Sequence, residues 1–294
     1  MTITNNMNLP EALVKAVSIE RHNKPGELSA TTLLNGTKQI ILRDRHWDEL
    51  VEDVADHFYV LYGSTAHKML EGEGQNEFSE VSVDYDVNDI KVTGRIDNYN
   101  MREGIVTDYK TASVWKIRYK NFEDWYRQGM IYAWLLRKND FMVKTCRFIA
   151  IIKDHSKRDA KRDSSYPQKP VYVYEFDVTE EGLAEIQNFI EAKITHYKQC
   201  RDMPDNDIPP CTSAERWEKP TKYAVMKEGR KSAVRVMDTQ EEADKLAAEL
   251  GKNHFVQIRP GESIRCAEYC SCNGFCNFFR DNAASAEDQD VNWP

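Results

Sequence analysis

The feature that most constrains the fold is a run of alternating apolar and polar residues that two short turns interrupt. Residues 81–86, 90–99 and 104–112 each alternate with period two, which is the pattern of β-strands with one buried face. The turn Met101-Arg-Glu-Gly104 joins the second and third of these segments. We therefore predict an antiparallel hairpin with Met101 opposite Gly104.

This hairpin would bring two carboxylates together. In the predicted register Asp97 lies directly opposite Asp108, and Lys110 lies two residues further along on the face of Asp108. Directly opposed like charges destabilise a sheet, and a divalent cation between them would reverse that effect. Carboxylate oxygens are ligands that Mg²⁺ and Mn²⁺ prefer.

The chemistry that suits such a site is phosphodiester hydrolysis. A bound metal ion polarises a phosphate oxygen and lowers the pKa of a bound water. Lys110 would orient or help to deprotonate that water, or neutralise charge that develops on the phosphate. The alternative is a set of solvated residues on an edge hairpin, because an Asp-x-Lys tripeptide is common. Only further motifs in the chain favour the first interpretation.

The rest of the first two hundred residues predicts a mixed α/β core. Helical spacing of apolar residues predicts helices, and short apolar runs predict buried strands. The expected fold is a central sheet flanked by helices. Further strands are expected at residues 147–153 and 171–177, and the polar, basic stretch between them is expected to be a loop. Helices are expected at residues 46–72, 122–138 and 180–199, the last with Thr179 as its N-cap.

A second region follows the linker-like stretch "CRDMPDNDIPPC". Residues 222–258 predict the order strand, tight turn, strand, helix, strand, which is a small β-β-α-β unit. The expected division of the chain is a core with an N-terminal helical region, a cysteine-rich subdomain that contains this unit, and a polar tail, at residues 1–204, 205–280 and 281–294.

Four of the seven cysteines lie within eleven residues: Cys266, Cys270, Cys272 and Cys276. In a long chain with no signal peptide, such a cluster favours a metal site over disulfides. Cys211 follows a Pro-Pro turn and is the candidate fourth ligand beside Cys266, Cys270 and Cys276, with Cys272 as a substitute for Cys270. Four thiolates suit Zn²⁺ or an iron–sulfur cluster, and the spacing leaves both open.

Five pieces of the sequence, in order, resemble motifs of the PD-(D/E)xK nuclease superfamily. The resemblance is to the branch that contains the RecB nuclease domain, AddB, cysteine-containing CRISPR adaptation nucleases and many phage exonucleases. "GSTAH" resembles a G-x-x-x-H helix motif, "GRID" and "DYK" the two catalytic strands, "QGMIY" a Q-x-x-x-Y helix motif, and the cysteines a metal cluster. "SATTLL" resembles a segment before the histidine helix. Together they span residues 29–276 and imply a restriction-endonuclease-like core.

The resemblance also implies roles for residues outside the hairpin. His67 would be a third ligand of the catalytic metal, since a neutral imidazole suits Mn²⁺. Gln128 and Tyr132 share a helix face and would face the metal centre and the DNA backbone. Glu71 lies one helical turn after His67 and either orients it or is a solvated helix-end glutamate.

Two further details keep alternatives open. Arg95 shares a strand face with Asp97 and either contacts a phosphate or pairs with Asp97.

Related cluster-bearing nucleases have their fourth cysteine before the core, whereas this chain has none before Cys146. With Cys211 as the fourth ligand, the cysteine site would be a local C-terminal staple. The family then implies a 4Fe-4S cluster, and the local layout is equally compatible with zinc.

Net charge and hydropathy limit how the protein can bind nucleic acid and where in the cell it is expected. A net charge of −8 argues against a protein coated with positive charge for nucleic acid, but it leaves room for a local basic groove. The best candidate for phosphate contacts is the basic loop 153–169, which is alternatively a solvated loop; its candidate residues are Lys157, Arg158, Lys161 and Arg162. No apolar run approaches the ~20 residues of a membrane span, so we expect a cytoplasmic protein of a bacterial host.

These observations predict a Mg²⁺- or Mn²⁺-dependent deoxyribonuclease. The leading hypothesis is an exonuclease of phage or prophage type that acts on DNA ends in recombination, replication or DNA degradation. A recombinase or a single-strand annealing protein would be its partner. Two alternatives are an endonuclease of the same superfamily, and a nucleic-acid-binding or assembly protein that keeps the fold without cleaving.

Overall fold

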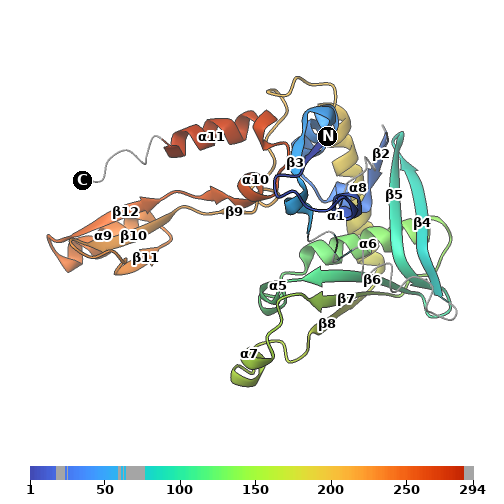
Figure 1. The fold of residues 1–294 in the computed structure, drawn as a ribbon, viewed down its shortest axis with the longest axis horizontal. Helices are drawn as coiled ribbons and strands as arrows, with labels where there is room; N and C mark the ends of the chain where they lie inside the picture. The colour runs from blue at the N-terminus through green and yellow to red at the C-terminus, as the bar shows by residue number, and fades with distance from the viewer. Residues whose placement is uncertain (18–23, 25, 59–60, 62, 64–76, 288–294) are drawn as a thin grey trace. The chain divides into compact units, whose positions relative to one another are not determined.

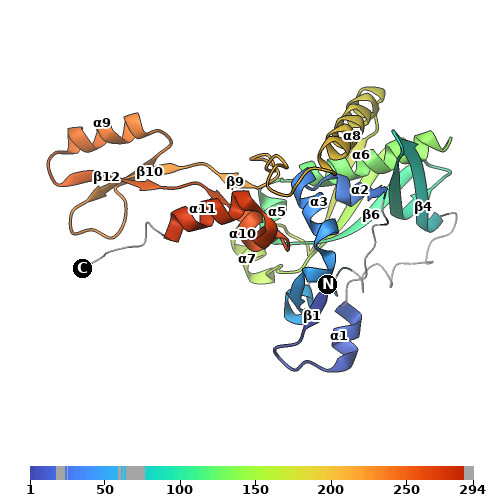
Figure 2. The same ribbon diagram turned by 90° about the horizontal axis from the view of Figure 1, so that it is seen from above.

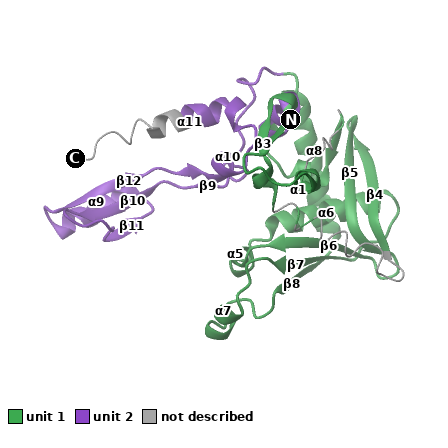
Figure 3. Ribbon diagram, in the orientation of Figure 1, with its two compact units in different colours: residues 1–37, 47–202 green, residues 38–46, 203–294 purple. Residues whose placement is uncertain are grey.

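A computed structural model describes residues 1–17, 24, 26–58, 61, 63 and 77–287 (Figure 1). The chain forms two compact units, residues 1–37 with 47–202 and residues 38–46 with 203–294 (Figure 3). Within the described ranges, no helix is long and apolar enough to cross a membrane.

The first unit is built on a six-stranded mixed sheet. Its strands are β2 (Glu27–Ser29), β4 (Glu77–Val87), β5 (Ile90–Asn100), β6 (Ile105–Ala112), β7 (Thr145–Ile152) and β8 (Val171–Asp177). The pairs β4–β5, β5–β6 and β7–β8 are antiparallel, while β6–β7 and β2–β5 are parallel. Helices flank this sheet, which confirms the predicted mixed α/β core (Figure 1).

The hairpin that carries the two aspartates has the predicted register. Asn98 pairs with Thr107, and Asn100 pairs with Ile105. Strand β4 pairs with β5 from end to end except at Glu80 and Asp97, so β2 and β6 must share the other edge of β5. The two shared stretches, residues 91–93 and 98–100, are separated by residues 94–97. Asp97 therefore lies where the strand pair opens.

Two long helices build the core on this sheet, and both were predicted. Helix α6 (Glu123–Lys138) packs on β4, β5, β6 and β7, and α8 (Glu180–Cys200) packs on α6 (Figures 1 and 2). The side chain of Thr179 caps α8 by accepting a hydrogen bond from Gly182 N at 3.0 Å. Ten residues of α6 are buried: Trp125 and every residue from Gln128 to Leu136.

Shorter helices occupy the loops of this unit. They are α1 (Glu11–Val17), α2 (Ala30–Leu33), α5 (Val114–Arg118) and α7 (Lys157–Arg162). Helix α7 lies in the basic stretch that was expected to be a loop. Its N-cap is Ser156, which accepts a hydrogen bond from Asp159 N at 3.2 Å.

The prediction of a helix over residues 46–72 is wrong in its first part. Residues 47–57 form two short 3₁₀ turns, η1 (Trp47–Glu49) and η2 (Val54–His57), on either side of β3 (Val51–Asp53). Strand β3 pairs in parallel with β1 (Thr2–Thr4). The Asp53 carboxylate accepts hydrogen bonds from Thr4 Oγ1, Asn6 N and Ala55 N at 2.8–3.0 Å. Pairing with the N-terminal strand thus overrides the local helical periodicity.

The second unit contains the predicted β-β-α-β order. Its elements are β10 (Lys222–Lys227), β11 (Arg235–Met237), α9 (Gln240–Leu250) and β12 (His254–Arg259), with β10 in the middle of the sheet. Val225 packs with Ala243 and Ala247 of α9 in a small core of its own, and Figure 2 shows α9 lying over this sheet. The remaining elements are β9 (Glu218–Lys219), β13 (Glu262–Ser263), α10 (Ile264–Glu268), η3 (Asn273–Phe275) and α11 (Asn277–Glu287).

The second unit also takes up an early segment of the chain. This segment, residues 38–46, consists of most of helix α3 (Thr37–Arg45) and His46, and the side chain of Lys38 is only 2% exposed. Its ammonium donates to Ile208 O and to Asn277 Oδ1, both at 2.7 Å. A buried ammonium needs such acceptors, because burying it without them would be costly. Lys38 therefore ties α3 to the segment before Cys211 and to α11.

A substitution at Gly129 tests how closely α6 packs on the sheet. A Cβ at this position would lie 2.9 Å from both Phe148 Cε2 and Phe176 Cζ. Gly→Ala in a helix interior normally stabilises by roughly 1 kcal/mol. We expect Gly129→Ala to destabilise instead, by about 1–3 kcal/mol, because two core rings must move. Urea denaturation would measure this.

Gly274→Ala is the matched control, since a Cβ there meets no atom within 4 Å. It should leave the denaturation midpoint close to that of the wild type. A stabilising Gly129→Ala would contradict the close packing of α6.

Candidate active site

The centre of the candidate site is the buried carboxylate of Asp108 on β6. Strand β6 pairs with β7 along its whole length, which places Asp108 beside Phe148 in the middle of the sheet. The residue is only 2% exposed. A buried carboxylate is costly unless charged or polar partners offset the loss of water.

Two side chains contact this carboxylate directly. The Lys110 ammonium lies 2.7 Å from Asp108 Oδ2. The Gln128 amide, from α6, donates to Asp108 Oδ1 at 3.2 Å and to the Tyr132 hydroxyl at 2.8 Å. The motifs "DYK" and "QGMIY" are therefore joined by hydrogen bonds within one site.

Asp97 approaches the same place from β5. Its Oδ2 accepts a hydrogen bond from Tyr109 N at 2.7 Å, so its carboxylate lies next to the residue that follows Asp108. In an uninterrupted hairpin this N–H would bond to the backbone of β5. Because the strands open here, a side chain of β5 takes that role, and the carboxylate is held toward β6.

The charge of Asp108 also affects the pKa of two buried groups near it, the Tyr132 hydroxyl and the Cys146 thiol. Burial, and secondly the charge of Asp108, raise the pKa of the Tyr132 hydroxyl well above its usual value. The same two causes raise the pKa of the Cys146 thiol, which donates to Gly129 O at 3.3 Å. Both groups stay neutral at physiological pH, so they add no negative charge next to the carboxylates.

The structure brings together Asp97, Asp108, Lys110, Gln128 and Tyr132, five of the residues that the sequence singled out. His67 and Glu71 lie outside the described residues. Arg95 is exposed and forms an ion pair with Glu80 of the neighbouring strand β4. The basic candidates Lys157, Arg158, Lys161 and Arg162 are exposed and lie on α7.

The candidate structural ligands gather in the second unit. Cys211, Cys266, Cys270 and Cys276 are partly buried, and all seven cysteines of the chain are free thiols. Burial, and then the charges of Cys270, Cys211 and Cys276, raise the pKa of Cys266 to about 11. These cysteines therefore lie close enough to influence one another electrostatically.

Cys272 is the most buried cysteine of the cluster. Its Sγ lies 3.6 Å from Cys270 Sγ and 3.6 Å from Gln39 O on α3. The hydrogen bond with Cys272, and then the nearby cations Arg265 and Arg43, lower the pKa of Cys270 to about 7. Segment 38–46 thus contributes to the surroundings of the cysteines, although it carries no cysteine itself.

The donor chemistry of both sites fits metal ions, but the donors are not arranged as preformed metal sites. Over the described part of the chain, no group of three or more His, Cys, Asp or Glu side chains is placed to hold a metal ion. In the first unit the two carboxylates suit a hard divalent cation, and His67 lies outside the described residues. In the second unit the thiols suit Zn²⁺ or an iron–sulfur cluster.

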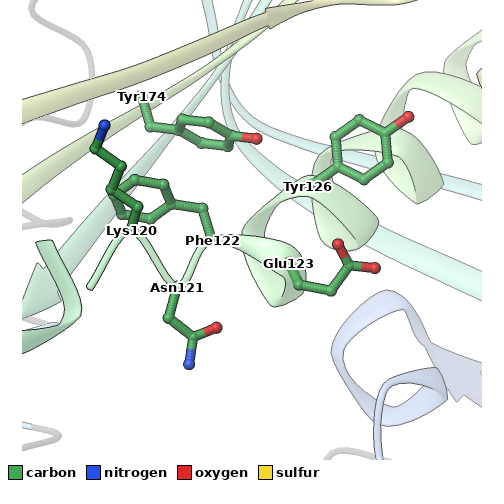
Figure 4. Close-up of a pocket in the computed structure, with 6 residues that line it drawn as sticks. All are labelled: Lys120, Asn121, Phe122, Glu123, Tyr126 and Tyr174. Atoms are coloured by element: carbon green, nitrogen blue, oxygen red, sulfur yellow. The ribbon is translucent and has the colours of Figure 1, made fainter.

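A pocket of about 490 Å³ lies near the start of α6, away from the carboxylates. Figure 4 shows Phe122 and Tyr174 side by side in it, with Lys120 beside them. Their ring centroids are 4.7 Å apart. Because the pocket lacks Asp97, Asp108 and Lys110, we do not assign it to the catalytic chemistry.

Two features of this unit were missed at the level of sequence. Cys146 lies on the strand next to Asp108, and no motif pointed to it. Trp115 and Tyr119 follow the "DYK" strand and are exposed. The stretch "VWKIRYK", in which two aromatic residues four positions apart alternate with basic residues, was the signal available for them.

Comparison with known proteins places the chain in a family. The family model of the PD-(D/E)XK nuclease superfamily matches residues 11–277. The chain therefore belongs to this superfamily, as its five motifs predicted. The sequence has no significant match among curated proteins.

Solved structures with a related fold are distant. The match to SSO0001 is 18% identical and covers 63% of this chain and 84% of that one, with a TM-score of 0.44. An alkaline exonuclease from Laribacter hongkongensis is 9% identical over 65% of this chain and 93% of its own, with a TM-score of 0.38. A phage-related exonuclease from Haemophilus somnus 129PT is 15% identical over 56% and 73%, with a TM-score of 0.30.

The raised pKa of Tyr132 predicts a pH dependence of stability. Unfolded Tyr132 loses its proton near pH 10, whereas the folded residue keeps it to higher pH. Above pH 10 the unfolded state then binds fewer protons, so the free energy of unfolding falls as pH rises. Between pH 10 and 11 we expect wild type to lose up to about 1 kcal/mol more than Tyr132→Phe.

Urea denaturation at pH 8, 10, 10.5 and 11 would measure this difference. The pH 8 values provide the baseline, since both proteins are fully protonated at residue 132 there. Parallel curves for the two proteins up to pH 11 would show that Tyr132 ionises normally in the folded state.

Proposed function

We propose that the protein is a Mg²⁺- or Mn²⁺-dependent deoxyribonuclease, and that it acts as an exonuclease. The observation that carries this proposal is the buried cluster of Asp108, Lys110 and Gln128, with the Asp97 carboxylate held beside it. Keeping a carboxylate buried in the middle of a sheet is costly and is not needed for packing. Membership of a nuclease superfamily gives that cluster a chemical purpose.

Each residue has a distinct part in the proposed reaction. Asp97 and Asp108 would hold the divalent cation, with His67 as a further ligand; when bound, the cation supplies a polarised phosphate and a more acidic water. Lys110 lies against Asp108, where its ammonium can orient the attacking water or stabilise charge on the phosphate. Gln128 fixes the orientation of the Asp108 carboxylate through its amide.

The wider setting follows the same proposal. The substrate would be DNA, attacked from its ends, in the cytoplasm of a bacterial host and in phage recombination, replication or DNA degradation. Exonucleases among the related structures are consistent with this class of activity. A recombinase or single-strand annealing partner stays a prediction.

Asp108→Asn tests the catalytic role. The change removes one charge with almost no change in volume, and it should lower the cleavage rate at least about a hundredfold, because ligation of the cation is impaired. End-labelled linear DNA and closed circular DNA, each with Mg²⁺ or Mn²⁺, are the substrates. Asp89→Asn is the matched control, since Asp89 pairs with Lys198 on the surface and its side chain is 96% exposed.

The outcomes separate the three hypotheses. Degradation of linear DNA by wild type and Asp89→Asn, but not by Asp108→Asn, supports the exonuclease. Cutting of closed circles would replace it by the endonuclease. Wild type that cleaves neither substrate with either metal would favour a binding or assembly protein.

We also propose that Cys211, Cys266, Cys270 and Cys276 bind Zn²⁺ or a 4Fe-4S cluster in the second unit. Their mutual electrostatic influence and the nearby cations Arg265 and Arg43 support this, because positive charge offsets that of several thiolates. Cys266→Ser should lower the bound metal to less than half of the wild-type content. Elemental analysis would measure the content of zinc and iron in each protein. Absorbance near 400 nm would show whether the iron belongs to an iron–sulfur cluster.

Cys200→Ala is the control for the cysteine site, since Cys200 lies on α8 in the first unit. It should keep the full metal content. Wild type purified without oxygen that contains neither zinc nor iron would contradict the proposed metal site.

A further inference from the structure

Two exposed aromatic rings follow the catalytic strand directly. Only Ser113 separates β6 from helix α5, whose Val114 and Ile117 are buried, while Trp115 of the helix and Tyr119 just after it are exposed. Trp115 is 53% exposed and Tyr119 is 75% exposed, the highest value for a large hydrophobic side chain in the described residues. Single exposed apolar residues are common on protein surfaces, but two exposed rings in contact with each other form a patch that indicates a binding surface.

The two rings stack on each other, and an arginine lies against one of them. Their centroids are 5.8 Å apart, and their planes differ by 21°. The Arg118 guanidinium lies 5.3 Å from the Trp115 ring centroid. We name Trp115, Arg118 and Tyr119 the aromatic platform. Flat rings with a guanidinium are the groups on which unstacked bases stack.

The platform is fixed to the basic helix α7. Arg118 donates to Asp163 Oδ2 at 3.0 Å and to Ser165 Oγ at 3.2 Å, just beyond the end of α7. Asp154, before α7, accepts a hydrogen bond from Val114 N at 2.7 Å. Figures 1 and 2 both show α5 and α7 next to each other at the same end of the sheet.

The charge around the platform differs from that of the whole chain. Residues 113–122 contain three basic residues and no acidic one, and residues 153–169 contain six basic and three acidic residues. The whole chain has a net charge of −8. Positive charge is thus concentrated where the rings are exposed, which suits a polyanion that carries aromatic bases.

The platform is also within reach of the catalytic residues. Trp115 lies five residues after Lys110, so their Cα atoms are at most about 18 Å apart. Roughly five stacked nucleotides span that distance at ~3.4 Å each. A strand on the platform can therefore extend to Asp108.

We propose that the aromatic platform and α7 bind single-stranded DNA and deliver it to the carboxylates. The substrate is then a single strand or an unpaired strand end, because bases in a duplex hide their faces in the stack. This substrate preference rests on the proposed nuclease function, whereas the binding itself does not.

The first test is binding of a fluorescent 20-nucleotide oligothymidylate and of a 20-base-pair duplex, followed by anisotropy. All proteins carry Asp108→Asn so that bound DNA stays intact. Trp115→Ala and Tyr119→Ala should each raise Kd for the single strand about five- to a hundredfold, the effect expected from removing one stacked ring. Trp115→Phe should restore most of the affinity, and Kd for the duplex should change less than twofold.

Tyr269→Ala is the matched control. Tyr269 is also exposed, at 61%, and its ring contacts Trp217, over which Arg265 lies, but it belongs to the second unit. It should leave Kd for the single strand unchanged. If Trp115→Ala does not fold, Tyr119→Ala carries the test, because three quarters of that side chain are open to solvent.

A second measurement addresses α7. Replacing Lys157, Arg158, Lys161 and Arg162 by Gln should flatten the dependence of log Kd on log salt by about 0.7 for each phosphate that these side chains neutralise in the wild type. An unchanged slope would remove α7 from the binding surface.

The outcomes separate this inference from the nuclease proposal. Unchanged Kd for the single strand in both alanine variants, or equal weakening for single strand and duplex, would overturn the inference even if wild type cleaves DNA. Weaker single-strand binding by the alanine variants in a protein whose wild type cleaves nothing would support the inference and overturn the nuclease.

Discussion

The buried carboxylate of Asp108 is the constraint on which the first unit depends. Its charge has lost most of its water, so Lys110 and Gln128 must contact it for the fold to be stable. Gln128 can do so only because α6 lies close to the sheet, and Gly129 permits that approach. The rings packed around Phe148 then fill the space between α6 and the sheet. Stability and the proposed chemistry therefore rely on the same contacts.

The geometry of the two aspartates could be predicted because it depends on local information. Alternation fixed the strands, and the turn from Met101 to Gly104 fixed the register, which places Asp97 beside Asp108. The opening of the strand pair at Asp97 could not be predicted, since it results from β2 and β6 sharing one edge of β5. Strands β2 and β5 lie about sixty positions apart in the sequence, so no local sequence pattern predicts that they pair.

The errors in the fold have the same origin. Residues 47–57 have helical periodicity, yet they pair with the first strand of the chain through β3. Residues 38–46 belong to the same compact unit as residues 203–294, and no pattern in the sequence of this segment predicts that. In contrast, the β-β-α-β unit was predicted correctly, because its strands, turn and helix are neighbours in the sequence. Contacts between distant residues decide both errors, and short-range patterns decide the successes.

The position of Lys38 has a consequence for synthesis of the chain. Its two acceptors lie 170 and 239 residues further on. At 5–20 residues per second, a ribosome needs roughly 10–30 s to reach the first of them. During that interval α3 has emerged, but the ammonium of Lys38, which is buried in the folded protein, has neither of its acceptors. Lys38 must therefore stay hydrated until residues 208 and 277 have been made, and a chain stopped after α8 would leave its ammonium permanently without both acceptors.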